Sequence, residues 1–319
     1  MPTRYVALAL GIALITGIVA LAMNEPDTGL LATDSSLSGT IEIDGSSTVF
    51  PITQAVAEEF RKVHPGVQVP VGVSGTGGGF KRFVVGETHI SNASRSIKPI
   101  EIAAAAENGV EFIEIAVGFD GLSIIANPAN DFLECLTTDE LRAIWEPGSE
   151  VNRWNDVRDG LPDSKFRLYG PDTDSGTFDY FTESIMHKED ASRSDYSASA
   201  DDNVLIRGIA GDDDALGYFG FAFYSSSPDK LKLIAVDSGS GCIYPSPVTI
   251  NDGTYSPLSR PMFIYVNTAA LEREEVVVFL NFYLDNATTL VEEVGYVSLP
   301  EAMYDDGRAL VASSSGSPN

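Results

Sequence analysis

Basic residues are scarce in this sequence. Only 20 Lys and Arg stand against 46 Asp and Glu among 319 residues, which gives a formal net charge of -26 at pH 7. Nucleic acids and anionic membrane surfaces are bound through Lys and Arg clusters, so this balance argues against both as partners. The apolar fraction of 44% is close to the globular norm, and the length allows about two domains.

Histidine is scarcer still, which argues against most metal sites and histidine-activated nucleophiles. The three histidines, His64, His89 and His187, are scattered along the chain without metal-ligand spacing. No G-x-S-x-G nucleophile elbow occurs, and no pair of carboxylates stands out as an acid–base couple. The sequence therefore predicts a protein that is not an enzyme, with no catalytic residue, no metal ligand and no cofactor.

Long apolar runs are absent except at the N-terminus. Val6–Ala22 carry no charge and follow Arg4, and the run is intermediate in length between a signal-peptide core and a membrane-spanning helix. Residues 1–22 are therefore a cleaved signal peptide or an uncleaved N-terminal membrane anchor, and a buried core helix is the less favoured alternative. Residues 23–39 have the polar composition of a linker. The rest of the chain is expected to be exported, to the periplasm or the cell surface.

Cysteine occurs only twice, at Cys135 and Cys242, both in the exported part. An oxidising compartment favours a disulfide between them, and two buried free thiols are the alternative. Neither cysteine has a second cysteine or a histidine at metal-ligand spacing.

Short apolar strands alternate with amphipathic helices from residue 40 onward, which is the pattern of a parallel α/β sheet. The strands are expected at 41–43, 67–73, 90–93, 111–117, 122–126, 166–170, 218–223, 231–236 and 263–266. The helices are expected at 51–64, 80–85, 100–108, 137–145, 177–187 and 275–284, and residues 312–319 are expected to form a disordered tail.

One local arrangement recurs three times: a strand ends, a turn of Ser, Thr and Gly follows, and a helix begins. The turns lie at 45–48, 74–79 and 174–177. A helix N-terminus offers unpaired N–H groups, and hydroxyls add further donors, so three converging turns would form an anion cage. Each turn alone is more typical of a simple helix cap, and it is the recurrence of three such turns that favours an anion site. The glycine run fits neither a Walker loop nor a dinucleotide loop, because Phe80 stands where each pattern needs glycine.

Arg95 is the candidate cation of this cage. It follows the strand predicted at 90–93, and an arginine at the carboxyl end of a strand fits bidentate capture of an oxyanion. A surface salt bridge is the alternative.

Four segments together resemble the PstS-type phosphate-binding proteins of ABC transporters: GSSTVFP at 45–51, GTGGGFKRF at 75–83, ISNASR at 90–95 and DSGTFDYF at 174–181. The resemblance continues through ASRSDY at 191–196, DDNVL at 201–205, ALGYFGFAFY at 215–224 and PLSRPMFIYV at 257–266. It covers about residues 40–305 in order.

The resemblance implies an α/β, two-lobed type II periplasmic-binding-protein fold with a hinge and a central anion cleft. Lobe one would comprise residues 40–119 and 260–311, and lobe two residues 120–259. The chain would cross between the lobes near 119–121 and return near 259–262.

The resemblance also implies which residues line the cleft. The phosphate-binding set would be Ser47, Thr48, Thr76, Gly77, Ser94, Arg95, Ser175, Gly176 and Thr177. In the family an Asp follows Ala-Ser and an Arg stands four residues before Ser-Gly-Thr, whereas this chain has Arg95 and Pro171 at those places. The carboxylate that accepts the phosphate proton is thus unassigned. Asp120 is the first candidate, with Asp174 and Asp44 as alternatives.

We therefore expect an extracytoplasmic, monomeric solute-binding protein that captures inorganic phosphate for uptake by a membrane permease of an ABC transporter. The alternatives are a binder of another oxyanion such as sulfate or molybdate, a secreted phosphate-handling enzyme, or a tethered receptor that signals.

Overall fold

The computed structural model describes residues 37–173, 175–199 and 201–316. The predicted signal or anchor, residues 1–22, lies outside them. The described chain is an α/β fold around a ten-stranded sheet, and β1 and β3 form a separate pair. The strands are β1 (Gly39–Thr40), β2 (Ile43–Gly45), β3 (Val67–Gln68), β4 (Ile90–Ala93), β5 (Phe112–Ala126), β6 (Cys135–Thr137), β7 (Arg167–Gly170), β8 (Ser197–Ala198), β9 (Ala215–Gly220), β10 (Lys232–Asp237), β11 (Cys242–Ile243) and β12 (Ser259–Asn267).

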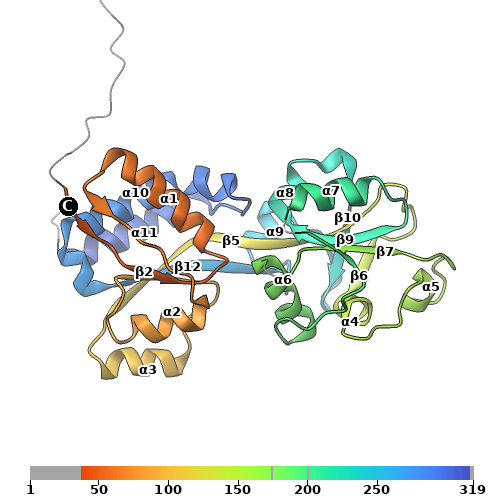
Figure 1. The fold of residues 1–319 in the computed structure, drawn as a ribbon, viewed down its shortest axis with the longest axis horizontal. Coiled ribbons are helices and arrows are strands. Elements are labelled where there is room, and N and C mark those ends of the chain that lie inside the picture. The colour runs from red at the N-terminus through yellow and green to blue at the C-terminus, as the bar shows by residue number, and fades with distance from the viewer. Residues whose placement is uncertain (1–36, 174, 200, 317–319) are drawn as a thin grey trace, which may run out of the picture. The chain divides into compact units, whose positions relative to one another are not determined.

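Helices flank the sheet (Figure 1). They are α1 (Phe50–Val63), α2 (Gly75–Phe83), α3 (Pro99–Glu107), α4 (Thr138–Trp145), α5 (Trp154–Val157), α6 (Gly176–Phe181), α7 (Asp202–Ala210), α8 (Phe221–Ser225), α9 (Pro247–Asn251), α10 (Glu274–Glu293) and α11 (Glu301–Ser314). A π-helical turn, Thr182–Met186, continues α6, and short 3₁₀ turns lie at Pro228–Lys230 and Thr268–Glu272. A capping box starts α4: Thr137 Oγ1 accepts from the Glu140 amide at 3.1 Å, and Glu140 Oε2 accepts from the Thr137 amide at 2.8 Å.

Two long strands, β5 and β12, run side by side through the sheet (Figure 1). They are antiparallel, and their register runs from Asn267 opposite Phe112 to Ser259 opposite Gly121. The sequence predicted two strands, 111–117 and 122–126, where the structure has the single strand β5. The intervening residues stay extended because β12 supplies backbone partners along them.

The sheet changes partners within β5. Up to Gly121 the strand pairs with β12. From Leu122 to Ala126 it pairs with β9, and from Ile124 to Ala126 it also pairs with β10. We call β2, β4, β12 and β5 up to Gly121 the first sheet section, and β5 from Leu122 with β9, β7, β8 and β10 the second sheet section. The change of partners coincides with the predicted crossover, while the division into lobes at 119/120 and 259/260 remains a prediction.

Alternate residues of β12 face opposite layers of helices. Phe263 and Tyr265 pack with residues of α2, and the Tyr265 and Phe80 ring centroids lie 4.9 Å apart. Ile264 faces the other layer, where the buried side chains of α1 and α10 gather. This period of two is what a strand covered on both faces requires.

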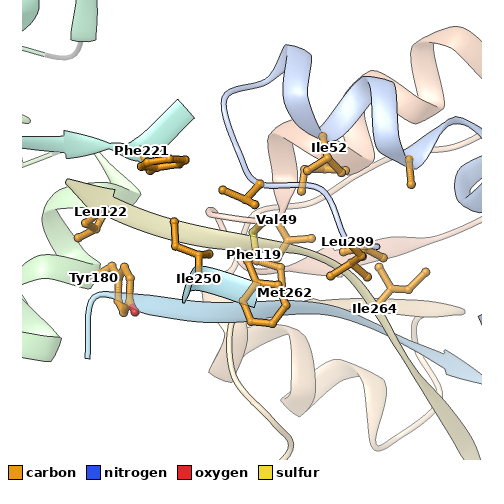
Figure 2. Packing of buried hydrophobic residues seen from close by; sticks show 14 of the residues in the cluster. Val49, Ile52, Phe119, Leu122, Tyr180, Phe221, Ile250, Met262, Ile264 and Leu299 are labelled. Atoms are coloured by element: carbon orange, nitrogen blue, oxygen red, sulfur yellow. The ribbon is translucent and has the colours of Figure 1, made fainter. Parts of the chain in front are cut away.

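One core cluster continues past the change of partners. Phe119 and Leu122 of β5 and Met262 of β12 lie in it together with Ile250 of α9 and Tyr180 of α6 (Figure 2). Gly121 admits this packing, because a Cβ at that position would lie 2.6 Å from Ile250 Cδ1. The place where β5 changes partners is therefore densely packed.

Several predicted boundaries were wrong. α2 begins at Gly75, not near Phe80, so the glycine run is helical. The strand expected at 67–73 is reduced to β3, since Pro70 has no N–H to donate. α11 extends to Ser314, so residues 312–314 of the expected tail are helical, and the expected linker ends before β1 starts at Gly39.

Candidate functional site

The first predicted turn, 45–48, is fixed against strand β4. Gly45 has a φ of +141°, and a Cβ there would lie 2.2 Å from the Asn92 carbonyl oxygen, so only glycine fits. The Ser46 amide donates to the same carbonyl at 3.0 Å, and Ser46 Oγ accepts from the Thr48 amide at 3.2 Å. The turn thereby places Thr48 just before helix α1.

The second predicted turn packs against the first. A Cβ on Gly79 would lie 2.5 Å from the Gly45 Cα atom, so the α2 backbone touches the first turn directly. Thr76 Oγ1 lies 3.1 Å from Ser94 Oγ and accepts from the Ser94 amide at 3.2 Å. A Cβ on Gly77 would meet nothing within 4 Å, so this side of the helix is open.

Asp44 ties these two turns together. Its Oδ1 accepts from the Gly45 amide at 2.8 Å and from the Ser74 amide at 3.1 Å, and its Oδ2 accepts from Arg82 Nη1 at 2.5 Å. Burial alone would raise the pKa of Asp44, but the hydrogen bonds from Arg82, Ser74 and Gly45 outweigh it and hold the pKa below its usual value. Asp44 therefore serves to organise the loops.

The third predicted turn reaches the first one. Ser175 is the N-cap of α6, and its Oγ accepts from the Thr177 amide at 3.2 Å. A Cβ on Gly176 would lie 3.2 Å from Thr48 Oγ1, so its backbone lies against Thr48. Ser47, next to Thr48, is exposed. Asp174, the alternative proton acceptor, lies outside the described residues.

Arg95 has a partner that the sequence did not predict. Its Nη1 donates to Glu101 Oε2 at 2.9 Å and its Nη2 to Glu101 Oε1 at 2.8 Å. These hydrogen bonds to Glu101 raise the pKa of Arg95 above its usual value. The guanidinium also lies 5.2 Å from the Phe80 ring centroid. Both terminal nitrogens are engaged by one carboxylate, as in the salt-bridge alternative.

Arg260 of β12 is the cation at the junction of the first and third turns. Its Nη2 donates to Thr48 Oγ1 at 2.9 Å and to Asp120 Oδ2 at 3.2 Å, and its Nε donates to the same oxygen at 3.3 Å. The side chain is 14% exposed. Sequence reasoning missed this residue because Arg260 lies within a strand and not in a turn that leads into a helix. The only signal was its place in the segment PLSRPMFIYV.

Asp120, the first candidate acceptor, is the buried partner of Arg260. Its side chain is only 3% exposed. Burial raises the pKa of Asp120, and the charge and hydrogen bonds of Arg260 oppose that rise. The structure therefore brings the predicted residues Asp120, Thr48 and Gly176 together around the unpredicted Arg260.

Asp179 is a second carboxylate near Arg260. Burial, followed by the negative charges of Glu189 and Asp190, raises its pKa to about 6, and Arg260 opposes the rise. The raised pKa makes Asp179 a second candidate for the proton acceptor of the site.

Cys135 and Cys242 form a disulfide with a sulfur–sulfur distance of 2.07 Å, as expected from the sequence. In the described ranges no group of His, Cys, Asp and Glu side chains is arranged to hold a metal ion. Nor does any described helix combine the length and apolar character needed to cross a membrane.

Comparison with known proteins places this chain in a family. The profile of the PBP superfamily domain matches residues 32–287. Protein SphX of Synechocystis is 47% identical over 279 residues, covering 86% of this chain and 83% of its own. Phosphate-binding protein PstS of Staphylococcus haemolyticus is 36% identical over 272 residues, covering 85% of this chain and 84% of its own.

A solved structure supports the same grouping. The crystal structure of a possible phosphate binding protein from Planctomyces limnophilus is 46% identical, with a TM-score of 0.83 over 88% of this chain and 99% of the other. The predicted type II periplasmic-binding-protein fold is confirmed. The chain is thus a member of the PBP superfamily and belongs with the PstS-type phosphate-binding proteins.

Proposed function

We propose that this chain captures inorganic phosphate outside the cytoplasm and delivers it to the permease of an ABC transporter. One observation carries the proposal: Thr48 contacts both Arg260 and Gly176. A cation, a hydroxyl and a glycine backbone thus meet where the first and third turns meet. Relatives that are phosphate-binding proteins by name support phosphate as the anion.

The proposed phosphate-contacting groups come from all three turns, from the two residues that follow β4, and from β12. Arg260 offers its remaining edge, because no described residue accepts a hydrogen bond from Nη1. Guanidinium and backbone N–H donors together replace the hydration shell of an oxyanion without a basic surface. The other members of the proposed set are Ser47, Thr48, Thr76, Gly77, Ser94, Arg95, Ser175, Gly176 and Thr177.

Asp120 is proposed as the acceptor of the phosphate proton. Near neutral pH phosphate carries a proton and sulfate carries none. A buried carboxylate can therefore accept a hydrogen bond from phosphate, whereas it only repels sulfate. Asp120 accepts hydrogen bonds from Arg260 and is almost fully buried, so water screens its charge little.

Uptake requires release as well as capture. The two proposed lobes would close on phosphate through bonds from both sides and would reopen at the permease. The change of strand partners at Gly121–Leu122 supports a hinge at that place. The disulfide supports action in an oxidising compartment, and the chain is proposed to act as a monomer without catalysing a reaction.

Calorimetry of the purified chain with phosphate, sulfate and molybdate tests the proposal. We expect one phosphate per chain and at least tenfold weaker binding of the other two anions. Preferential binding of sulfate or molybdate would assign the site to another oxyanion, and hydrolysis of a phosphate ester by the pure chain would favour the enzyme alternative.

A further inference from the structure

An aromatic ring covers one face of the Arg260 guanidinium. The Arg260 Cζ atom lies 3.8 Å from the centroid of the Tyr180 ring. The Tyr180 side chain is buried and only 5% of the residue is exposed. At this distance ring and guanidinium attract each other through the negative face of the ring, and the contact is stronger where water is excluded.

The ring is anchored at its other end. Tyr180 Oη donates a hydrogen bond to the Pro257 carbonyl oxygen at 2.8 Å. Pro257 lies three residues before Arg260, in the segment that leads into β12. Burial raises the pKa of Tyr180, so the phenol keeps its proton and remains a donor. The ring is therefore held relative to the segment that carries the arginine.

We propose that Tyr180 is a positioning residue for Arg260, an inference that rests on the proposed function. The stacked ring fixes the guanidinium plane and leaves only its edges for hydrogen bonds. One edge meets Asp120 and Thr48, which directs the free Nη1 toward the anion. Tyr180 touches the cation and not the phosphate.

The position of Tyr180 in the chain gives this contact a second consequence. Tyr180 lies in α6, whose first residue Gly176 packs against Thr48. One short helix therefore carries both the third turn and the ring that orients the cation. Movement of α6 away from β12 would remove the Tyr180 ring from the Arg260 side chain. The same movement would separate the third turn from Thr48.

The test compares phosphate affinities of full-length variants by calorimetry. Tyr180→Leu removes the ring and should lower the phosphate affinity about three- to thirty-fold. Tyr180→Phe keeps the ring and should change the phosphate affinity less than about threefold. Tyr196→Leu is the matched control, because Tyr196 Oη likewise donates to a proline carbonyl, that of Pro171, at 2.8 Å. No described cation stacks on Tyr196. The control should bind phosphate as the parent does.

The cycle is completed in an Arg260→Gln background, with phosphate binding followed by ³¹P NMR. There Tyr180→Leu should change affinity less than about twofold, since no cation remains to be oriented. An equal loss in both backgrounds, or an equal loss with Tyr196→Leu, would make Tyr180 a purely structural residue. If Tyr180→Leu binds phosphate as tightly as the parent, only the positioning role of Tyr180 is overturned. If the parent chain does not bind phosphate, the proposed function is overturned.

Discussion

Arg95 and Arg260 differ in their hydrogen-bond partners. Arg95 gives both terminal nitrogens to Glu101. Arg260 shares one edge with Asp120 and Thr48 and keeps another nitrogen without a described acceptor. A guanidinium already bound to a carboxylate on both nitrogens has less to offer an anion than one with a free edge.

Alanine substitution separates the two arginines. Arg260→Ala should weaken phosphate binding about ten- to a hundred-fold, because a charged hydrogen bond contributes roughly 1.5–3 kcal/mol. Parent-like affinity after Arg260→Ala would remove Arg260 from the site. Arg95→Ala tests the sequence-based assignment by the same titration: a tenfold loss would retain Arg95 as a ligand, and no loss would leave it a partner of Glu101 only.

The proposed preference for phosphate over sulfate depends on a single carboxylate, that of Asp120. Asp120→Asn should narrow the preference for phosphate over sulfate by about tenfold or more, since an amide neither accepts the phosphate proton as a carboxylate does nor repels sulfate. Competition between the two anions, measured in the parent and in the variant, gives the ratio. Asp179→Asn is the comparison variant. If it narrows the preference and Asp120→Asn does not, Asp179 is the acceptor.

At the scale of elements, local signals predicted many helices and strands but missed α7 and α11. The strand at 90–93 and helices α1, α3 and α4 were predicted to within one or two residues, because their periodicity and caps are local. The continuity of β5 was missed, since it depends on β12, which is distant in sequence. The start of α2 at Gly75 was missed because glycine disfavours helix unless packing decides, as it does at Gly79.

The same distinction explains the site. The three turns were found because each is a local Ser, Thr and Gly pattern at a helix start. Arg260 was missed because its neighbours Thr48 and Asp120 come from distant parts of the chain, and only the pairing of β12 with β5 brings it to them.

Helix α7 carries a carboxylate whose ionisation opposes folding. Burial, with the adjacent Asp201 charge, raises the pKa of Asp202 from 3.8 to about 6. The folded state therefore binds this proton more tightly than the unfolded state. The ionised carboxylate lowers the free energy of unfolding above about pH 6, and this destabilisation disappears as the pH falls below 3.8.

Asp202→Asn should accordingly raise the free energy of unfolding at pH 7.5 by about 1–2 kcal/mol and leave it unchanged near pH 3.5. Urea denaturation at the two pH values measures the difference. Asp306→Asn, at an exposed position of α11, is the control and should stay within about 0.5 kcal/mol of the parent. A gain of equal size at both pH values would show that the charge of Asp202 is not its cause.

The whole molecule carries a net charge of -26 and is proposed to bind an anion. Like charges spread over one chain destabilise the compact state, and dissolved salt screens them. Raising NaCl from about 10 mM to about 200 mM should therefore raise the thermal midpoint by roughly 2–6 °C. Calorimetry at both salt concentrations, without phosphate, measures this shift, and a lower midpoint at high salt would mean that attractive ion pairs dominate over repulsion.

The central claim is that phosphate binds where Thr48, Gly176 and Arg260 meet, and a crystal structure of the full chain with phosphate tests it most directly. We predict one phosphate that accepts hydrogen bonds from the Arg260 guanidinium and from groups of the first and third turns, with Tyr180 still stacked on Arg260 and a carboxylate of Asp120 or Asp179 at hydrogen-bond distance. A phosphate bound beside Arg95 without any contact to Arg260, or bound away from all three turns, would contradict the account.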